Sequence, residues 1–184
     1  MRQIQILLIG FLLTCTGLSG RADVCVDDRA CVVGELQSCL GVREKTGKND
    51  GPEVESFLAS VGLGKGYAWC GAFLNKCFQT CSADTPKSAA WSPAWFPDSK
   101  IIFRHADLYS GKVYKNPQPG DVIGLYYPRL KRVGHVGAVI EWGAKTVRTI
   151  EGNTSGGGSR EGDGVYYMVR PVQTIHAVAD WIST

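Results

Sequence analysis

Cys70 is the first residue whose setting could support catalysis. It follows Tyr67-Ala68-Trp69 and precedes Gly71, at the point where a helical repeat of apolar residues begins. Backbone N–H groups and the dipole at a helix N-terminus favour a thiolate over a thiol. Cys70 is therefore a candidate nucleophile, and the alternative is a buried or disulfide-bonded structural cysteine.

A histidine and two oxygen-bearing side chains follow Cys70 in the sequence. His135 lies in Gly134-His135-Val136-Gly137, where the glycines leave room for another group to approach. Glu151 and Asn153 are two residues apart on a predicted strand, so we expect them on the same face. A cysteine protease site needs a thiolate, an imidazole that moves the proton and an acceptor that orients the imidazole. The ordered set is therefore more informative than any one member.

These residues and their surroundings resemble the CHAP family of cysteine amidases and endopeptidases, a papain-like group that cuts peptidoglycan. The resemblance extends from about Val42 to Asn153. The segments that carry it are Thr46-Gly47-Lys48-Asn49-Asp50-Gly51, Tyr67-Ala68-Trp69-Cys70-Gly71-Ala72-Phe73, Pro119-Gly120-Asp121-Val122-Ile123, Gly134-His135-Val136-Gly137 and Glu151-Gly152-Asn153.

The resemblance implies a role for each candidate site residue. Cys70 would be the nucleophile, His135 the base, Glu151 the group that orients it and Asn153 a fourth supporting residue. Some members carry an acidic calcium loop before the nucleophile, but Gly62-Leu63-Gly64-Lys65-Gly66 has no carboxylate. We therefore expect no metal and no cofactor, and peptidoglycan as the partner.

Two other functions remain open from the sequence. An NlpC-type cell-wall endopeptidase shares the order of cysteine and histidine, although Glu151-Gly152-Asn153 fits the CHAP pattern better. A catalytically inactive, disulfide-stabilised secreted binding module is the alternative from a different class. An unreactive, disulfide-bonded Cys70 would favour that binding module.

The elements that would position these residues form an α+β pattern. Helices are predicted from Cys31 to Val42, from Asp50 to about Gly62 with Asp50 as the cap and Glu53 reaching back, and from Cys70 to Cys81. Strands are predicted at 121–127, 134–142, 146–153 and 165–169. A turn is predicted at 131–134, directly before the second of these strands, and 84–120 is predicted to be irregular. We therefore predict a papain-like fold with N-terminal helices packed on a C-terminal antiparallel sheet.

Composition and charge describe an ordinary globular chain. Apolar residues make up 44% and charged residues 20% of the 184 residues, which excludes a largely disordered protein. The formal net charge is only +3, so nothing suggests a nucleic-acid partner. Residues 1–22 are predicted to be a signal peptide too short to span a membrane, which leaves 23–184 as one catalytic domain. Lipid attachment through Cys15 is a weaker match.

Export predicts disulfides among the cysteines other than Cys70. Five cysteines remain after the signal peptide and Cys70 are set aside: Cys25, Cys31, Cys39, Cys77 and Cys81. The sequence does not choose among the pairings. Cys77 and Cys81 lie further along the helix face that Cys70 begins, and we expect that at least one of them is bridged to or packed against the N-terminal segment that carries Cys25, Cys31 and Cys39.

Strand parity makes one geometric prediction about the site. Residues opposite each other in an antiparallel pair share a face, so His135 and Glu151 share a face only if paired residue numbers sum to an even value. A three-residue loop at 143–145 that pairs Trp142 with Thr146, or a bulge with the same effect, meets this condition.

Overall fold

The computed structural model describes residues 28–107, 110, 115–157 and 162–183. The predicted signal peptide and Cys25 lie outside this part of the chain. None of the helices formed by the described residues has the length and apolar character needed to cross a membrane.

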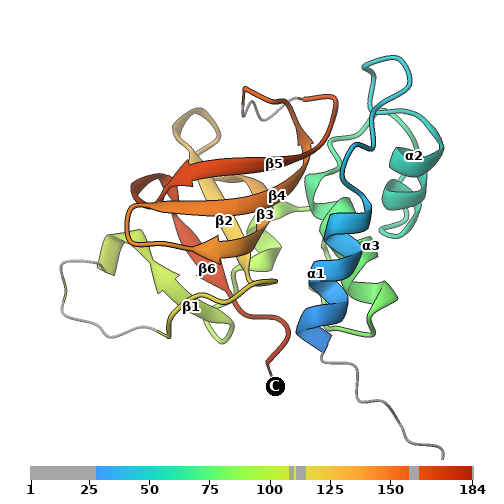
Figure 1. Ribbon diagram of the computed structural model, residues 1–184. Coiled ribbons are helices and arrows are strands. Elements are labelled where there is room, and N and C mark those ends of the chain that lie inside the picture. The colour runs from blue at the N-terminus through green and yellow to red at the C-terminus, as the bar shows by residue number, and fades with distance from the viewer. Residues whose placement is uncertain (1–27, 108–109, 111–114, 158–161, 184) are drawn as a thin grey trace, which may run out of the picture.

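Three helices gather beside the sheet (Figure 1): α1 (Asp28–Ser38), α2 (Pro52–Ala59) and α3 (Cys70–Thr80). All three were predicted from apolar periodicity, although α1 begins earlier and ends sooner than expected. Their apolar faces pack into one core cluster together with residues of the central strands. Burial of this kind, more than intrinsic helix propensity, stabilises helices this short.

The predicted cap of α2 is wrong. Gly51, with a φ of 112°, occupies the N-cap position, and its backbone N–H donates to the Glu55 carboxylate at 3.1 Å. Asp50 lies one residue too far from the helix, and its carboxylate instead accepts from the backbone and hydroxyl of Thr46. Glu55 rather than Glu53 therefore reaches back across the first turn.

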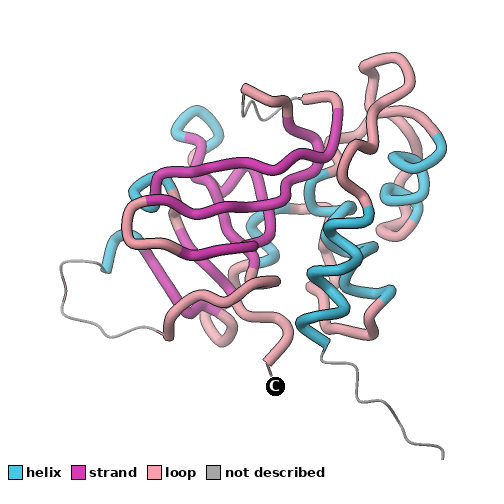
Figure 2. Tube along the Cα trace, viewed as in Figure 1, coloured by secondary structure: helices cyan, strands magenta, loops and turns pink. Residues whose placement is uncertain are grey.

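The sheet is antiparallel throughout, in the strand order β1-β6-β2-β3-β4-β5. Its strands are β1 (Ile101–Arg104), β2 (Val122–Tyr127), β3 (Arg132–Trp142), β4 (Thr146–Thr154), β5 (Gly164–Pro171) and β6 (Ala177–Ala179). Figure 1 labels these strands, and Figure 2 shows them in magenta beside the helices in cyan. The predicted fold class is confirmed, with four strands anticipated and two missed. β1 and β6 have four and three residues, too few to show a clear alternation of apolar and polar side chains.

The turn before β3 also differs from the prediction. It lies at Pro128–Leu130, a short 3-10 helix, and Lys131 ends it in a left-handed conformation with a φ of 52°. β3 therefore begins at Arg132, within the segment expected to form the turn. A bulge follows, because Leu125 pairs with His135 but Tyr126 pairs with Val133, which leaves Gly134 as the extra residue.

The hairpin between β3 and β4 satisfies the parity condition by a bulge. Three residues connect the strands, but Trp142 pairs with Val147 rather than with Thr146. The register then shifts at Ile140, and Val139 pairs with Thr149, which gives the even sum that the site requires. The loop length is as predicted, whereas the pairing next to it is not.

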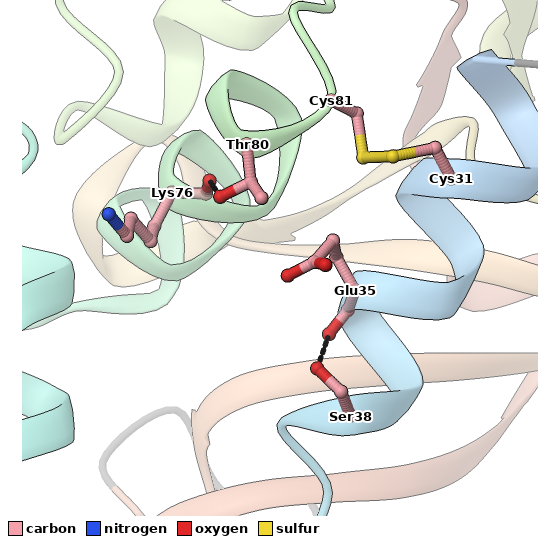
Figure 3. The surroundings of a disulfide bond; sticks show 6 residues. All are labelled: Cys31, Glu35, Ser38, Lys76, Thr80 and Cys81. Atoms are coloured by element: carbon pink, nitrogen blue, oxygen red, sulfur yellow. Dashed lines mark hydrogen bonds between the residues drawn. A yellow bond between two sulfur atoms is a disulfide. The ribbon is translucent and has the colours of Figure 1, made fainter. Parts of the chain in front are cut away.

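One disulfide joins α1 to the end of α3 (Figure 3). Cys31 and Cys81 are bridged across a sequence separation of 50 residues. This confirms the expectation that Cys77 or Cys81 is linked to the N-terminal segment. Cys39, Cys70 and Cys77 are free thiols.

Candidate active site

Cys70 is the first residue of α3 and is 5% exposed. Its neighbours explain how the helix start is held against the rest of the molecule. Trp69 is fully buried and its indole N–H donates to the Glu44 carboxylate at 2.9 Å. A Cβ atom at Gly71 would lie 2.2 Å from the Ala89 carbonyl oxygen, so only glycine allows this close approach. The nucleophile candidate is therefore fixed by packing on both sides.

His135 lies directly after the Gly134 bulge of β3, with no solvent exposure. Its Nε2 atom is 2.9 Å from Oε2 of Glu151 on β4. An ionised carboxylate only accepts hydrogen bonds, so Nε2 carries the proton and donates. Gly137 makes this pairing possible, because a Cβ atom there would lie 2.5 Å from Cγ of Glu151.

Both carboxylate oxygens of Glu151 are engaged. Oε1 accepts from the Thr149 hydroxyl at 2.6 Å and from Nε of Arg170 at 2.9 Å. Oε2 accepts from His135 and from Nη2 of Arg170 at 2.6 Å. Burial alone would raise the pKa of Glu151, but these hydrogen bonds, first that of Arg170 and then that of His135, lower it to about 2. Glu151 is thus a buried anion held from three sides.

The thiol and the imidazole stabilise each other's charged forms. Burial raises the pKa of Cys70, but the hydrogen bond and charge of His135 outweigh it, with help from the Val136 N–H and the Ser92 hydroxyl, and lower it to about 7. Burial lowers the pKa of His135, whereas Cys70 and Glu151 raise it to about 9. Since Nε2 faces Glu151, Nδ1 is the nitrogen available to Cys70. Between these two pKa values the pair favours thiolate and imidazolium.

Asn153 is placed by a further bulge, between β4 and β5. Glu151 pairs with Tyr166 but Thr154 pairs with Gly164, so β4 contains one extra residue here, and Asn153 has a φ of 55°. The simple alternation assumed from the sequence therefore does not hold between Glu151 and Asn153. Asn153 is 2% exposed and lines the pocket at Cys70, while Glu151 faces His135.

A small pocket of about 80 Å³ opens over the candidate nucleophile. Trp91 forms part of its mouth and is 55% exposed, and the Ser92 hydroxyl lies 3.8 Å from the Cys70 sulfur. The lining residues come from four separate segments: Ala68, Cys70, Ala90, Trp91, Ser92, Arg132, Gly134 and Asn153. A scissile carbonyl bound here would have access to the sulfur and to the N-terminal turn of α3.

The structure brings together all four residues singled out from the sequence. The other two histidines lie elsewhere: His105 begins the 3-10 helix after β1, and His176 packs beside Tyr126. Sequence reasoning missed Arg170, Thr149, Ser92 and Arg132. Thr149 could have been found, because it lies two residues before Glu151 on the same strand. The other three come from segments whose distance to the site depends on the tertiary fold.

An α+β fold that brings a thiol at a helix start to a strand imidazole and a buried carboxylate defines a papain-like architecture. The CHAP domain model matches residues 62–153, half of the chain, and the chain belongs to the CHAP family. Membership supports a hydrolase function with peptidoglycan as the substrate class. No curated protein and no solved structure matches the chain.

Proposed function

We propose that this protein is an exported cysteine hydrolase that cleaves amide or peptide bonds of peptidoglycan. The observation that carries the proposal is the His135 imidazole fixed by the Glu151 carboxylate at 2.9 Å next to the buried free thiol of Cys70, whose pKa it lowers. Family membership supplies the substrate class, and the geometry supports the thiol mechanism.

In the proposed reaction the Cys70 thiolate attacks the carbonyl carbon of the scissile bond. Backbone N–H groups at the start of α3 would stabilise the resulting oxyanion. The His135 imidazolium then gives its proton to the leaving amine, which leaves a thioester on Cys70. His135, now neutral, removes a proton from water; the hydroxide attacks the thioester and releases the carboxylic acid and the Cys70 thiolate, which restores the thiolate–imidazolium pair. Glu151 keeps the imidazole oriented throughout, and Asn153 supports the pocket wall.

We further propose that residues 1–22 direct export to the periplasm or the cell exterior, and that 23–184 is the catalytic unit. The Cys31–Cys81 disulfide supports an oxidising compartment, since such bridges are rare in reducing cytosol. Attachment to lipid through Cys15 would be detected as a mass increase and membrane retention after export.

The test is digestion of purified peptidoglycan, with the released fragments identified by mass spectrometry. Cys70→Ala and His135→Ala should each reduce fragment release by several powers of ten, because loss of a nucleophile or its base has that effect. Cys39→Ala is the matched control, since Cys39 is a free thiol outside the site, and it should retain activity. The new termini in the fragments identify the bond that is cut.

Two results would contradict the proposal. Full activity of Cys70→Ala would exclude the thiol mechanism. Wild-type protein that binds peptidoglycan but releases no fragment would favour the binding module.

A further inference from the structure

We propose that Arg170 is a positioning residue of this site: it holds Glu151, and through Glu151 the His135 imidazole, and its charge sets the pH range over which the site is reactive. Arg170 lies on β5, beyond the residues 62–153 that match the family model. This inference rests on the proposed roles of Cys70 and His135.

Arg170 forms a buried, bidentate ion pair with Glu151 rather than a surface ion pair. Its Nε and Nη2 atoms donate to the two oxygens of Glu151 at 2.9 and 2.6 Å, a bidentate geometry that restricts rotation of the carboxylate. The Arg170 side chain is only 14% exposed and the Glu151 side chain is fully buried. Such a pair is screened little by solvent, so its geometry persists.

Strand register explains how a residue so distant in sequence reaches the site. Arg170 pairs with Val147, and Met168 pairs with Thr149, so Arg170 shares a sheet face with Thr149 and Glu151. The hairpin between β4 and β5 therefore brings a cation to the side of Glu151 away from the imidazole. Without it, a buried carboxylate beside His135 would lose its largest favourable hydrogen bond.

The charge of Arg170 acts directly on Glu151 of β4, whose pKa it lowers, and it interacts with Tyr127 of β2. Glu151 in turn raises the pKa of His135 of β3, and His135 lowers that of Cys70 of α3, so the charge reaches both groups through the carboxylate. A nearby cation favours the deprotonated form of each neighbour. Removing it should raise the pH at which Cys70 becomes a thiolate and the pH at which His135 loses its proton.

The experiment is the pH dependence of Cys70 alkylation by iodoacetamide, measured alongside peptidoglycan hydrolysis. Alkylation needs no substrate, so it tests Arg170 even if peptidoglycan is the wrong substrate. Arg170→Gln should move both limbs of the profile to higher pH by roughly one pH unit and reduce hydrolysis about tenfold. Arg170→Lys keeps the charge but not the bidentate geometry, so its limbs should stay in place while hydrolysis falls.

Arg148→Gln is the matched control. Arg148 is an exposed arginine of β4, half open to solvent, and its removal should leave the alkylation profile unchanged. If Arg170→Gln only lowers stability and leaves both limbs in place, Arg170 is structural and the inference is wrong. Should Arg170→Gln fail to fold, an Arg170→Lys variant with wild-type hydrolysis would equally overturn the positioning role.

A different observation, the lining of the pocket, leads to a second inference. We infer that Arg132 binds a carboxylate of the substrate next to the scissile bond. Among the described residues that line the pocket, Arg132 is the only lysine, arginine, aspartate or glutamate. The Gly134 bulge lies between it and His135, which breaks the alternation of faces along β3. This inference names a feature of the substrate and rests on the proposed hydrolysis of peptidoglycan.

One hydrogen bond orients the guanidinium of Arg132, and its other N–H groups can still donate to a substrate. Nη1 donates to the Val133 carbonyl at 2.9 Å, and the side chain is half-buried at the pocket wall. The remaining N–H donors suit a carboxylate, which a guanidinium binds in a bidentate manner. Peptide stems of peptidoglycan carry free carboxylates beside several of their amide bonds, and these become carboxamides when the stem is amidated.

The test uses two muropeptides that differ only in one group: the second stem residue carries either a free α-carboxylate or the corresponding carboxamide. Wild-type protein should prefer the carboxylate about tenfold in kcat/KM, mainly through KM, since a charge-assisted hydrogen bond contributes roughly this much. In Arg132→Gln that ratio should fall to about one. Arg129→Gln, an exposed arginine outside the lining, should keep the wild-type ratio.

The outcomes separate this inference from the proposed function. If the wild-type protein hydrolysed neither the two muropeptides nor whole peptidoglycan, the proposed function would be contradicted. Equal hydrolysis of both by wild-type protein would contradict only the carboxylate site.

Discussion

Two buried arginine–carboxylate clusters lie on different parts of this molecule and serve different ends. In the first, Arg170 holds Glu151, whose other partner is the His135 imidazole. In the second, Arg29 of α1 donates to Asp121 at 2.8 Å and to Asp180 at 3.1 Å. Both contain fully or nearly fully buried carboxylates, so the ionic chemistry is the same.

The two clusters differ in the groups that the carboxylates contact besides their arginine. Asp121 is held further by the Gln118 backbone N–H, and Asp180 by Lys115 and by backbone N–H groups near the C-terminus. That cluster ties α1 to the segments next to β2 and β6, and none of its members lines the pocket at Cys70. The Glu151 cluster ends on an imidazole that faces a thiol. A buried ion pair becomes a candidate for catalysis only when its last member faces a reactive atom.

The opposite pKa shifts of the two fully buried carboxylates reflect this difference. Burial raises the pKa of Asp121, and its hydrogen bonds from Gln118 and Arg29 only partly offset that effect. The pKa of Glu151 is lowered despite similar burial, because Arg170 and His135 both donate to it. Asp121 lies in one of the segments that resemble the CHAP family, yet its contacts stabilise the fold and do not reach the site.

Replacement of Glu151 should have the largest effect on activity. Glu151→Ala leaves Arg170 and His135 without their shared acceptor, and hydrolysis should fall about 100-fold or more. Glu151→Gln should be milder, about tenfold, because its amide oxygen can still accept from His135 while its amide group meets Arg170 unfavourably. Fragment release from peptidoglycan measures both.

Asp121→Asn is the comparison variant for the other cluster. It should leave hydrolysis within about twofold of wild type at a temperature where it is folded. A loss of hydrolysis equal to that of Glu151→Ala would mean that the two clusters are not separate in function.

Much of the site could be predicted because its local signals are strong. A helix start at Cys70 and a strand at Glu151 follow from apolar periodicity alone. For His135 and Glu151 to share a face, the paired residue numbers of β3 and β4 must sum to an even value, and the bulge at Ile140 produces this pairing. What could not be predicted is which irregularity the chain would use, since a loop and a bulge satisfy the same condition.

Other features depend on contacts that no local pattern records. Arg170 reaches Glu151 only through the β4–β5 register, and Ser92 reaches Cys70 from a segment that reads as irregular. Asn153 has a left-handed conformation at a bulge, and the alternation of apolar and polar residues along its strand gives no sign of that bulge. Each depends on long-range pairing, which sequence periodicity does not determine.

Arg29→Met should cost the most stability among the cluster variants. It leaves two buried aspartates without their shared cation, and breaking such a network by removing one partner costs about 3 kcal/mol. Urea unfolding at pH 7 measures this loss. The pH limbs of Cys70 alkylation should stay at their wild-type positions, in contrast to those of Arg170→Gln; a shift of the limbs would show that Arg29 acts on the site.

Asp180 should make stability depend on pH in acid. Burial would raise its pKa, but Lys115 and the hydrogen bonds near the C-terminus hold the pKa well below its usual value. A carboxylate with a lowered folded pKa stabilises above its unfolded pKa, and this contribution is lost as pH falls. Asp180→Asn should therefore be less stable by about 2 kcal/mol at pH 7, and the difference should shrink below about pH 4. A difference that stays constant down to pH 2 would rule out this linkage.

The smallest effect should come from an arginine–carboxylate pair in water. Arg148 and Glu141 approach to 3.3 Å, but their side chains are 53% and 66% exposed. Solvent screens their attraction, and ordering two long side chains offsets most of the gain, so exposed pairs contribute about 0.5 kcal/mol or less. Arg148→Ala should change the free energy of unfolding by no more than that, and high salt should remove the difference. A cost comparable to that of Arg29→Met would mean that strand position, and not burial, decides what such a pair contributes in this fold.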